Sequence, residues 1–398
     1  MEAAPLTLTA RRTRIGERLG VAYFDGWLLA AALGLISFSI LTLAVATPHA
    51  VEGQPFYFAI RQSLYALVGI ALMLAVARVD YSRFREIRVG IYSLMIASIS
   101  IVLMFGAAAR GSRRWIELPY FRFQPSELAK LLLIVALAAF VIERTRRGSP
   151  LRQTLRMLAL GLAPAALVLL QPDLGTGIVL GVITITILFL AGVPWRHFAA
   201  IGGLAAAVVS FALVIAPAAG LPSPLHGYQQ DRLTAFLHPS NDPSDASYQV
   251  NQSVTAIGSG EKTGRGDNST QTELLFLPER HTDFVFAVIG ERFGFAGAAF
   301  VLSLYALLLW RMLRILTLSE NLYGTLIVGG IVAMLLSQIM VNVGMTLGIM
   351  PVTGITLPLM SYGGSSVLAT FLAIGLLQSI HAQARLDSRS RAPTPLLR

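Results

Sequence analysis

The sequence of 398 residues contains no cysteine and few charged residues. Without cysteine there can be no disulfide, no thiolate nucleophile and no cysteine-ligated metal, although this says little about the compartment. Charged residues make up 13% of the chain and hydrophobic residues 55%, whereas about a quarter of an ordinary soluble domain is charged. The composition therefore excludes an ordinary soluble domain.

Internal repeats, low-complexity tracts and a separate soluble domain are also lacking. The chain has instead a series of apolar runs, each long enough to cross a hydrocarbon core of roughly 30 Å as a helix. We predict an all-α polytopic membrane protein, with residues 1–398 forming one transmembrane domain of about ten helices. The predicted spans lie near residues 26–46, 58–77, 89–109, 125–142, 157–171, 176–192, 199–217, 284–310, 323–346 and 359–380.

The first span is preceded by arginines and ends near Ala44-Val45-Ala46, which imitates a signal-peptidase site. Its apolar run over 27–46 is longer than the core of a signal peptide, which usually has about 7–15 residues. We therefore predict a first helix that is retained.

Basic residues predict the orientation of the spans. Arginines gather in the segments 1–22, 78–88, 143–156 and 382–398, which lie on one side when ten spans are threaded. Both termini are therefore predicted to be cytoplasmic, 1–22 as a basic segment and 382–398 as a flexible tail. The formal charge of +10 reflects these segments and predicts no nucleic-acid partner. Residues 217–283 become one long extracytoplasmic loop.

One predicted outside loop, 110–124, goes against this charge bias, because Arg110, Arg113, Arg114 and Arg122 crowd it. An outward basic cluster favours a function such as holding an anionic substrate. Contact with lipid headgroups is the alternative.

The long loop ends with Asp283, where the chain returns to the membrane. A charge at that position is unfavourable unless it is paired or used, and partial desolvation makes a carboxylate a better proton acceptor. We predict that Asp283 is the catalytic residue. Thr282 or Asp283 alternatively caps the next helix, and the two roles are compatible. His281 has no second histidine at ligand spacing, so we predict no metal site there.

Two further carboxylates start predicted helices. Glu127 and Lys130 are three residues apart on one helical face and are expected to pair, either as a structural ion pair or as part of the outer site. Asp173 is expected to cap the helix that follows it, or to help hold a cation or a sugar hydroxyl.

Several polar features have local interpretations. Apolar residues at helical spacing around Val254 and around Phe236 predict short amphipathic helices in the long loop. The glycine-rich stretch 258–266 lacks a phosphate-loop ending and is expected to be a flexible turn. Glu291 and Arg292 are expected to pair with other helices.

Near the C-terminus, Gln338 and Asn342 are expected to form hydrogen bonds across helices. Residues 351–358 interrupt the helices before the small residues of 361–366, where Ser365 lies. Free backbone N–H groups at such a helix start can hold an anion, and close helix packing is the alternative.

Five blocks, in order along nearly the whole chain, resemble the signature of the SEDS family (shape, elongation, division and sporulation). They are Gly111-Ser-Arg-Arg-Trp-Ile116, Phe123-Gln-Pro-Ser-Glu-Leu-Ala-Lys130, Gln171-Pro-Asp-Leu-Gly-Thr176, Leu277-Pro-Glu-Arg-His-Thr-Asp-Phe284 and Leu357-Pro-Leu-Met-Ser-Tyr-Gly-Gly-Ser-Ser366. The start Phe24-Asp25-Gly-Trp and the stretches 230–233 and 351–354 favour the elongation branch over the division branch. Gly260-Glu-Lys-Thr263 departs from the family pattern, which leaves the conformation of that loop open.

The resemblance implies a peptidoglycan glycosyltransferase that polymerises lipid II at the outer face of the bacterial plasma (inner) membrane. It also implies a class B penicillin-binding protein and other elongation-complex proteins as partners. Asp283 matches the family's essential acid, and Trp115 another functionally important position. No cofactor is required by the resemblance, although a divalent cation, magnesium or manganese, at the pyrophosphate stays open.

In the expected mechanism Asp283 takes the proton of the attacking sugar hydroxyl, and cationic side chains stabilise the departing diphosphate. The absence of an Asp-x-Asp motif fits a lipid-linked donor. A lipid II flippase, or a non-catalytic scaffold, is the competing interpretation. The residues predicted to bind substrate are Arg113, Arg114, Trp115, Glu127, Lys130, Asp173, Glu279, His281 and Ser365.

Overall fold

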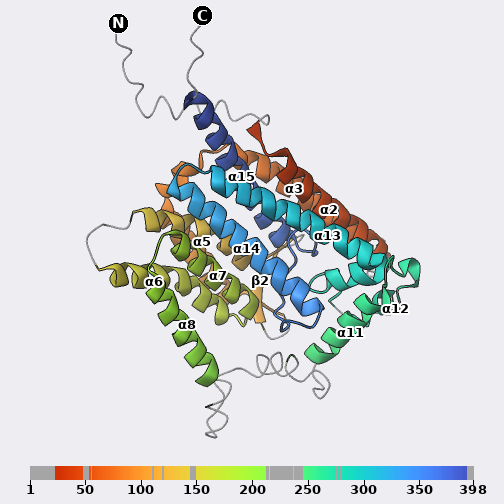
Figure 1. Cartoon of the computed structure of the whole chain (residues 1–398). Helices are drawn as coiled ribbons and strands as arrows, with labels where there is room; N and C mark the ends of the chain where they lie inside the picture. The colour runs from red at the N-terminus through yellow and green to blue at the C-terminus, as the bar shows by residue number, and fades with distance from the viewer. Residues whose placement is uncertain are drawn as a thin grey trace, which may run out of the picture.

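Long helices form most of the molecule, as the computed structural model of the chain shows (Figure 1). The structure describes residues 23–47, 53–54, 56–109, 112–118, 121–143, 149–211, 215, 236, 245–273, 276–277 and 279–391. The helices are α2 (Gly26–Ala46), α3 (Tyr57–Ala77), α4 (Arg88–Phe105), α5 (Pro125–Ile142), α6 (Pro150–Leu169), α7 (Leu174–Leu190), α8 (Trp195–Ser210), α11 (Asp245–Ser259), α12 (Thr270–Glu273), α13 (Val285–Leu318), α14 (Leu322–Thr346) and α15 (Gly364–Arg391). Two short 3-10 helices, η2 (Tyr81–Arg85) and η4 (Gly266–Asn268), complete the helical elements.

The helices α2 to α8 and α13 to α15 occupy the predicted spans. Seven helices of the described chain are long and apolar enough to cross a membrane, and α7, with 17 residues, is a shorter apolar helix. Some ends differ from the prediction. The last helix begins at Gly364 and continues to Arg391, so the part of the predicted flexible tail from 382 to 391 is helical.

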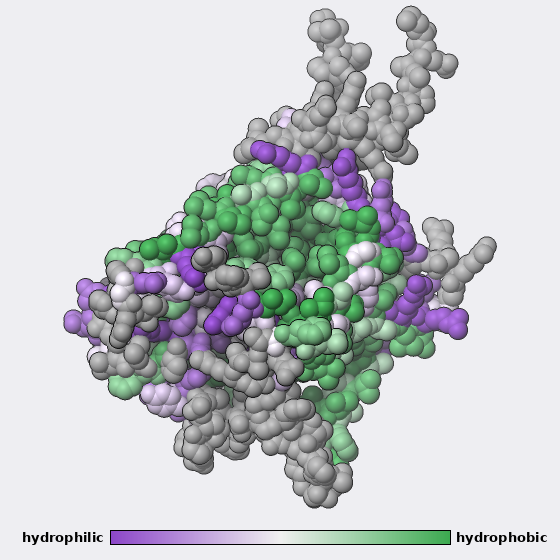
Figure 2. All heavy atoms as spheres, turned by 180° about the vertical axis from the view of Figure 1, so that it is seen from behind, coloured by the Kyte–Doolittle hydropathy of each residue, from purple (hydrophilic) through white to green (hydrophobic). Residues whose placement is uncertain are grey.

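Three helices form the centre of the bundle. Between two thirds and nine tenths of the apolar window of α5, α14 and α15 is buried, against 22% for α4. A helix that is apolar on all faces is expected in such a central position. The outer helices present their side chains outward, and Figure 2 shows a broad hydrophobic surface with hydrophilic residues at its edges. The helix α8 has no buried residue and extends away from the bundle (Figure 1).

A small antiparallel sheet lies between α4 and α5, and the prediction of an all-α fold missed it. Its strands β1 (Ala107–Ala109), β2 (Ser112–Leu118) and β3 (Phe121–Phe123) follow in the order β1-β2-β3. Ile116 pairs with Phe123, and Trp115 with Ala107. The helix α4 ends at Phe105, and adjacent strands then satisfy the backbone polar groups of this segment.

The glycine-rich turn that we expected to be flexible is packed against a break in α13. Gly294 has φ 64° and ψ −160°, and a side chain there would collide with the backbone of Gly264. The N–H groups of Phe295 and Ala296 donate to the carbonyls of Glu261 and Lys262 at 2.9 and 3.1 Å. The turn thus supplies acceptors for the N–H groups that the break exposes.

Glu291 and Arg292 bind two short helices of the polar loop, α12 and η4, so the expected pairing with other helices is confirmed. The buried Glu291 carboxylate accepts from Gln271 N at 2.8 Å, and from the N–H and hydroxyl of Thr272 at 3.0 and 2.6 Å. Arg292 forms an ion pair with Asp267. The polar loop is therefore anchored to α13 by two charged residues. The predicted helix near Val254 is confirmed as α11, and the one near Phe236 lies almost entirely outside the described residues.

The beginning of α2 lies beside the later part of α15. Asp25 N donates to Gln378 Oε1 at 2.7 Å, Gln378 Nε2 donates back to Asp25 O at 3.0 Å, and His381 Nδ1 lies 3.1 Å from Tyr23 O. Arg311, toward the end of α13, pairs with the Asp25 carboxylate at 2.5 Å. The two ends of the described chain therefore lie at the same end of the bundle, as the predicted orientation requires.

We expect Asp25→Asn to destabilise the protein by about 3–5 kcal/mol, because it leaves the Arg311 charge without its partner. Burial by itself raises the pKa of Asp25, but hydrogen bonds from Arg311 and Leu28 N–H, with the Arg311 charge, more than offset it and hold the pKa below 3.8. The pair's contribution is therefore present above the ordinary pKa and lost as the pH falls through the lowered one. Thermal unfolding from pH 7 to pH 3 measures this: wild type loses stability in acid, and the variant loses less. Parallel curves would contradict it.

Candidate functional site

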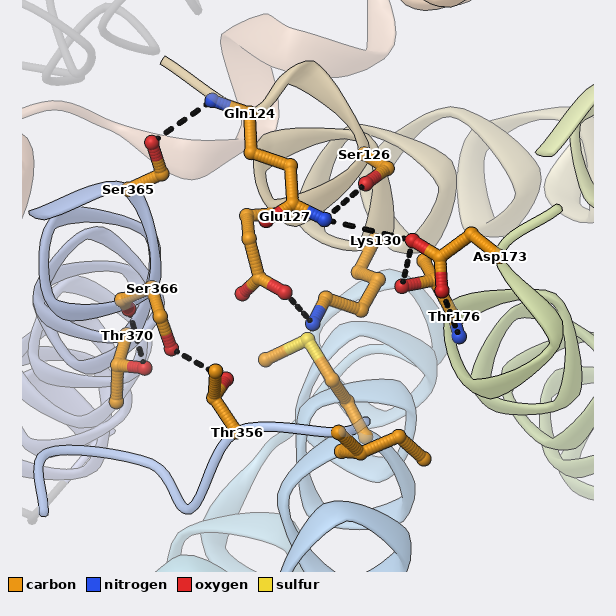
Figure 3. A network of polar contacts seen from close by, with 12 residues as sticks. Gln124, Ser126, Glu127, Lys130, Asp173, Thr176, Thr356, Ser365, Ser366 and Thr370 are labelled. Carbon is orange, nitrogen blue, oxygen red and sulfur yellow. Dashed lines mark hydrogen bonds and ion pairs between the residues drawn. The ribbon is translucent and has the colours of Figure 1, made fainter. Parts of the chain in front are cut away.

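A buried ion pair lies near the beginning of α5, at the end of the bundle opposite Asp25. Lys130 Nζ donates to Glu127 Oε1 at 2.8 Å, and the two residues are only 3% and 6% exposed. The predicted pairing is thus confirmed, but the lysine does not reach the surface. Figure 3 shows both side chains pointing into the space between α5 and Thr356. Because water is excluded there, each charge acts more strongly than it would in solvent.

Asp173, at the beginning of α7, joins this group of residues from the other side. Its carboxylate accepts from Thr176 N at 3.2 Å and from the Thr176 hydroxyl at 3.0 Å, so the predicted helix cap is confirmed. The amide of Gln124 reaches the same carboxylate at 3.4 Å. Arg114 lies 3.8 Å from it and also donates to Pro172 O. The acid that caps α7 therefore also holds an arginine of β2.

The beginning of α15 completes this cluster. Ser365 Oγ accepts from Gln124 N at 2.9 Å and donates to Arg122 O at 3.2 Å. Ser366 and Thr356 share a hydrogen bond of 3.1 Å (Figure 3). Its named residues, Gln124, Glu127, Lys130, Asp173, Arg114, Ser365 and Thr356, come from four separate parts of the chain, and we call them the α5 cluster.

Asp283 lies in a tight turn, residues 279–284, just before α13. The N-cap residue of α13 is Phe284, whose side chain makes no cap hydrogen bond, so the expected position of the N-cap at Thr282 or Asp283 is wrong. The Thr282 hydroxyl donates to Glu279 Oε2 at 2.8 Å. Asp283 is half-buried. Its position at a partly exposed turn suits a residue that meets a substrate.

The extended segment 351–363 holds this turn in place. Three successive carbonyls accept hydrogen bonds: that of His281 from Tyr362 N at 2.8 Å, that of Thr282 from Ser361 Oγ at 2.6 Å, and that of Asp283 from Asn342 Nδ2 at 2.8 Å. The His281 ring stacks on Phe58 with 4.5 Å between ring centroids. The backbone around the acid is therefore fixed from several sides.

The same segment touches the α5 cluster. Asn342 Nδ2 also donates to Ile355 O at 2.7 Å, and Gly175, two residues after Asp173, lies so close that a Cβ would meet Ile355 Cγ1 at 2.6 Å and Thr353 O at 2.9 Å. The segment thus lies between the Asp283 turn and the α5 cluster.

Of the predicted site residues, Trp115 lies half-buried on β2 and in neither group. Arg113 is also on β2, and its side chain lies outside the described part of the chain. The described residues contain no group of three or more histidine, aspartate or glutamate side chains that could hold a metal ion. In the α5 cluster Glu127 and Asp173 face Lys130 and Arg114. A divalent cation at the diphosphate therefore stays a prediction, and the described residues offer no group of carboxylates to bind it.

Sequence reasoning missed the roles of Gln124 and Ser361 in building the site, and it expected other partners for Asn342. Gln124 joins Asp173 to Ser365, Ser361 fixes the turn, and Asn342 bonds two carbonyls rather than a neighbouring helix. Gln124 and Ser361 stand inside the motif blocks, which was the available signal. For Asn342 the available signal was a polar side chain within an apolar helix. Within the described residues Gln338 makes no hydrogen bond, so its expected bond across helices is absent there.

The fold and the site together define an integral membrane protein with a polar site enclosed at one end of its helix bundle. Comparison with known proteins gives the family. Residues 22–386 match the FtsW/RodA/SpoVE family model, described as a cell cycle protein. The chain belongs to this family, which is the SEDS family that the motifs predict.

Individual relatives agree. The chain is 35% identical over 381 residues to the probable peptidoglycan glycosyltransferase FtsW of Idiomarina loihiensis, covering 93% of this chain and 90% of that protein. It is 35% identical over 369 residues to the peptidoglycan glycosyltransferase MrdB of Escherichia coli, covering 92% and 96%. A solved structure, from work on the structural coordination of polymerization and crosslinking by a peptidoglycan synthase complex, matches with a TM-score of 0.75 and 31% identity, covering 91% of this chain and 98% of that one.

Proposed function

We propose that this chain is a peptidoglycan glycosyltransferase that polymerises lipid II at the outer face of the bacterial plasma membrane. The observation that carries the proposal is the presence, on the two sides of one segment, of a half-buried acid, Asp283, and of the enclosed α5 cluster with Lys130 and Arg114. One extended segment contacts both. The chain is similar, over nearly their whole length, to relatives named as peptidoglycan glycosyltransferases, and this supports the same activity.

In the proposed reaction the Asp283 carboxylate accepts the proton of the C4 hydroxyl of the acceptor's N-acetylglucosamine. That oxygen forms a bond to the anomeric carbon of the donor from the side opposite the leaving group, so the configuration inverts. The bond from the anomeric carbon to the diphosphate oxygen breaks, and undecaprenyl diphosphate leaves with the electron pair. Lys130, Arg114 and Arg113 stabilise the negative charge that develops on it.

The remaining predicted residues have supporting roles. Trp115 lies on the same strand as these arginines and is proposed to contact the substrate beside them. Glu279, His281 and Ser365 are proposed to line the substrate path, because the first two belong to the Asp283 turn and Ser365 to the α5 cluster. Asp173 orients Arg114.

A crosslinking partner follows from the same chemistry, since new glycan strands have to be joined. We propose a class B penicillin-binding protein and the elongation complex. The relationship to a polymerising and crosslinking synthase complex supports this. The named relatives FtsW and MrdB are equally similar at 35% identity, so assignment to the elongation branch rests on the sequence motifs.

The function is tested with the purified full-length chain in lipid nanodiscs, alone and with its co-purifying penicillin-binding protein, and with labelled lipid II. We expect glycan chains and released undecaprenyl diphosphate. A flippase is the second candidate, because broken helices such as α13 also occur in transporters. Transfer of lipid II between leaflets of a vesicle without polymerisation would replace the glycosyltransferase by the flippase.

A further inference from the structure

Asn342 occupies a position that the proposed reaction does not yet use. It lies on α14, is fully buried, and places its amide nitrogen 2.8 Å from Asp283 O and 2.7 Å from Ile355 O. Both neighbours are carbonyl oxygens, which can only accept, so the nitrogen rather than the oxygen of the amide must face them. The two N–H bonds of one rigid amide group thus set the distance between two separate chain segments.

The carbonyl of Asp283 accepts one of these two bonds. In a regular helix a carbonyl at the N-terminal end would accept from an N–H four residues later, but Ala287 N and Val288 N both donate to Phe284 O. The neighbouring carbonyls of His281 and Thr282 are held by residues 361 and 362. Asn342, from outside the turn, holds the backbone of the acid's own residue.

The other carbonyl that Asn342 holds leads to the α5 cluster. Ile355 and Thr353 pack directly on Gly175, next to the residues that hold Arg114. A shift of Ile355 would therefore move the segment that lies between Asp283 and the cations Lys130 and Arg114. The Asn342 amide thus links the Asp283 turn to the segment beside the α5 cluster, and the proposed reaction needs these two parts of the site at a fixed distance.

The amide oxygen shows that this arrangement is not optimised for stability alone. Asn342 Oδ1 is buried and has no hydrogen-bond partner, which offsets part of what the two donated bonds contribute. A buried polar group with an unsatisfied atom in the interior of an apolar helix calls for an explanation. Setting the geometry of the site supplies one.

We propose that Asn342 is a positioning residue of the glycosyltransferase site, which sets Asp283 and the 351–363 segment as one unit by bonding both of their carbonyls. The expected effect on the rate rests on the proposed function. The expected effect on the mobility of the two segments does not. Catalytic geometry is sensitive at this scale, since a misplacement of about 1 Å can lower a rate about 100-fold.

The test compares Asn342→Leu, which keeps the approximate shape and removes both donors, with Gln338→Leu. Gln338 is a buried amide one turn earlier on the same helix, and it bonds neither segment within the described residues. We expect Asn342→Leu to lower kcat about 10- to 100-fold with KM for lipid II changed less than about threefold. We expect Gln338→Leu to keep both constants within about twofold.

Hydrogen–deuterium exchange gives a readout that is independent of activity. In Asn342→Leu the peptides covering 279–284 and 351–363 should both exchange at least about tenfold faster, whereas Gln338→Leu should change neither. Unchanged exchange in both peptides, or an equal increase in the two variants, would overturn the inference even if kcat falls. If wild type makes no glycan, the proposed function fails, and the exchange result still decides whether Asn342 couples the segments.

Asn342→Asp is the second variant, in case the leucine variant does not fold. The aspartate has the same shape, donates one hydrogen bond when protonated and none when ionised. The kcat of Asn342→Asp should therefore fall as the pH rises through the range in which this aspartate ionises. The wild-type kcat should not fall in that range, when both rates are normalised to the amount of folded protein. Superimposable pH profiles of the aspartate variant and wild type would overturn the positioning role.

Discussion

Asp283→Asn is expected to lower the rate of glycan polymerisation by about 10²- to 10⁴-fold, the usual contribution of a positioned general base. The asparagine has nearly the same shape and cannot accept the proton of the attacking hydroxyl. Because Asp283 is only half-buried and asparagine keeps its size, the variant should unfold at nearly the wild-type temperature. Polymerisation of labelled lipid II and thermal unfolding, measured on the same preparation, check both statements.

The matched control is Glu261→Gln. Glu261 is an exposed carboxylate of the same polar loop, and its contact within the described residues is the backbone bond from Phe295 N to its carbonyl. This variant should polymerise at the wild-type rate. Full activity of Asp283→Asn would remove the general base from the mechanism, and equal losses in both variants would point to loop charge rather than to a specific acid.

Lys130→Met is expected to have the second large effect, on stability as well as on activity. Removing the lysine leaves the Glu127 carboxylate buried without a partner, which costs about 3–5 kcal/mol in the free energy of unfolding. It also removes a donor for the leaving diphosphate. Loss of one such donor typically lowers kcat about 10²- to 10³-fold.

The double variant Glu127→Gln/Lys130→Met separates the two effects. Without either charge, most of the lost stability should return, but the rate should stay at least about 100-fold below wild type. Recovery of both stability and rate would mean that the pair is structural only. These quantities are measured by unfolding in mixed micelles and by lipid II polymerisation.

Arg88→Met serves as the control for this experiment. It breaks the partly exposed ion pair between Arg88 and Glu143, whose side chains are 23% and 36% exposed, at the opposite end of α5. A pair in contact with water contributes about 0–1 kcal/mol. We expect a small change in stability and no change in rate. A large loss of rate in this variant would show that activity responds to general destabilisation.

Local features of the sequence predicted local features of the structure. The Glu127–Lys130 pair and the Asp173 cap both formed as expected, because each depends on residues three apart on one helix. The N-cap expected at Thr282 or Asp283 lies at Phe284 instead, and distant residues, 342, 361 and 362, hold the turn before it.

The polar loop shows the same limit. The glycine-rich turn looked flexible because its composition permits many conformations, yet it supplies the acceptors for the broken helix at Gly294. The sheet β1-β2-β3 was missed because two of its three strands have only three residues each. In both cases the decisive partners are backbone groups, which every residue has and which a sequence therefore does not distinguish.

The sequence by itself determined that the chain is a bundle of apolar helices, since a backbone in lipid has to satisfy its own hydrogen bonds and helices do so within one segment. It also identified the family through its motifs, and predicted which acid is catalytic. Only the tertiary structure decided which distant groups meet. Gln124 and Ser365 are 241 positions apart, and Asn342 and Asp283 are 59 apart. Such contacts depend on how every helix packs, and no spacing along the chain encodes them.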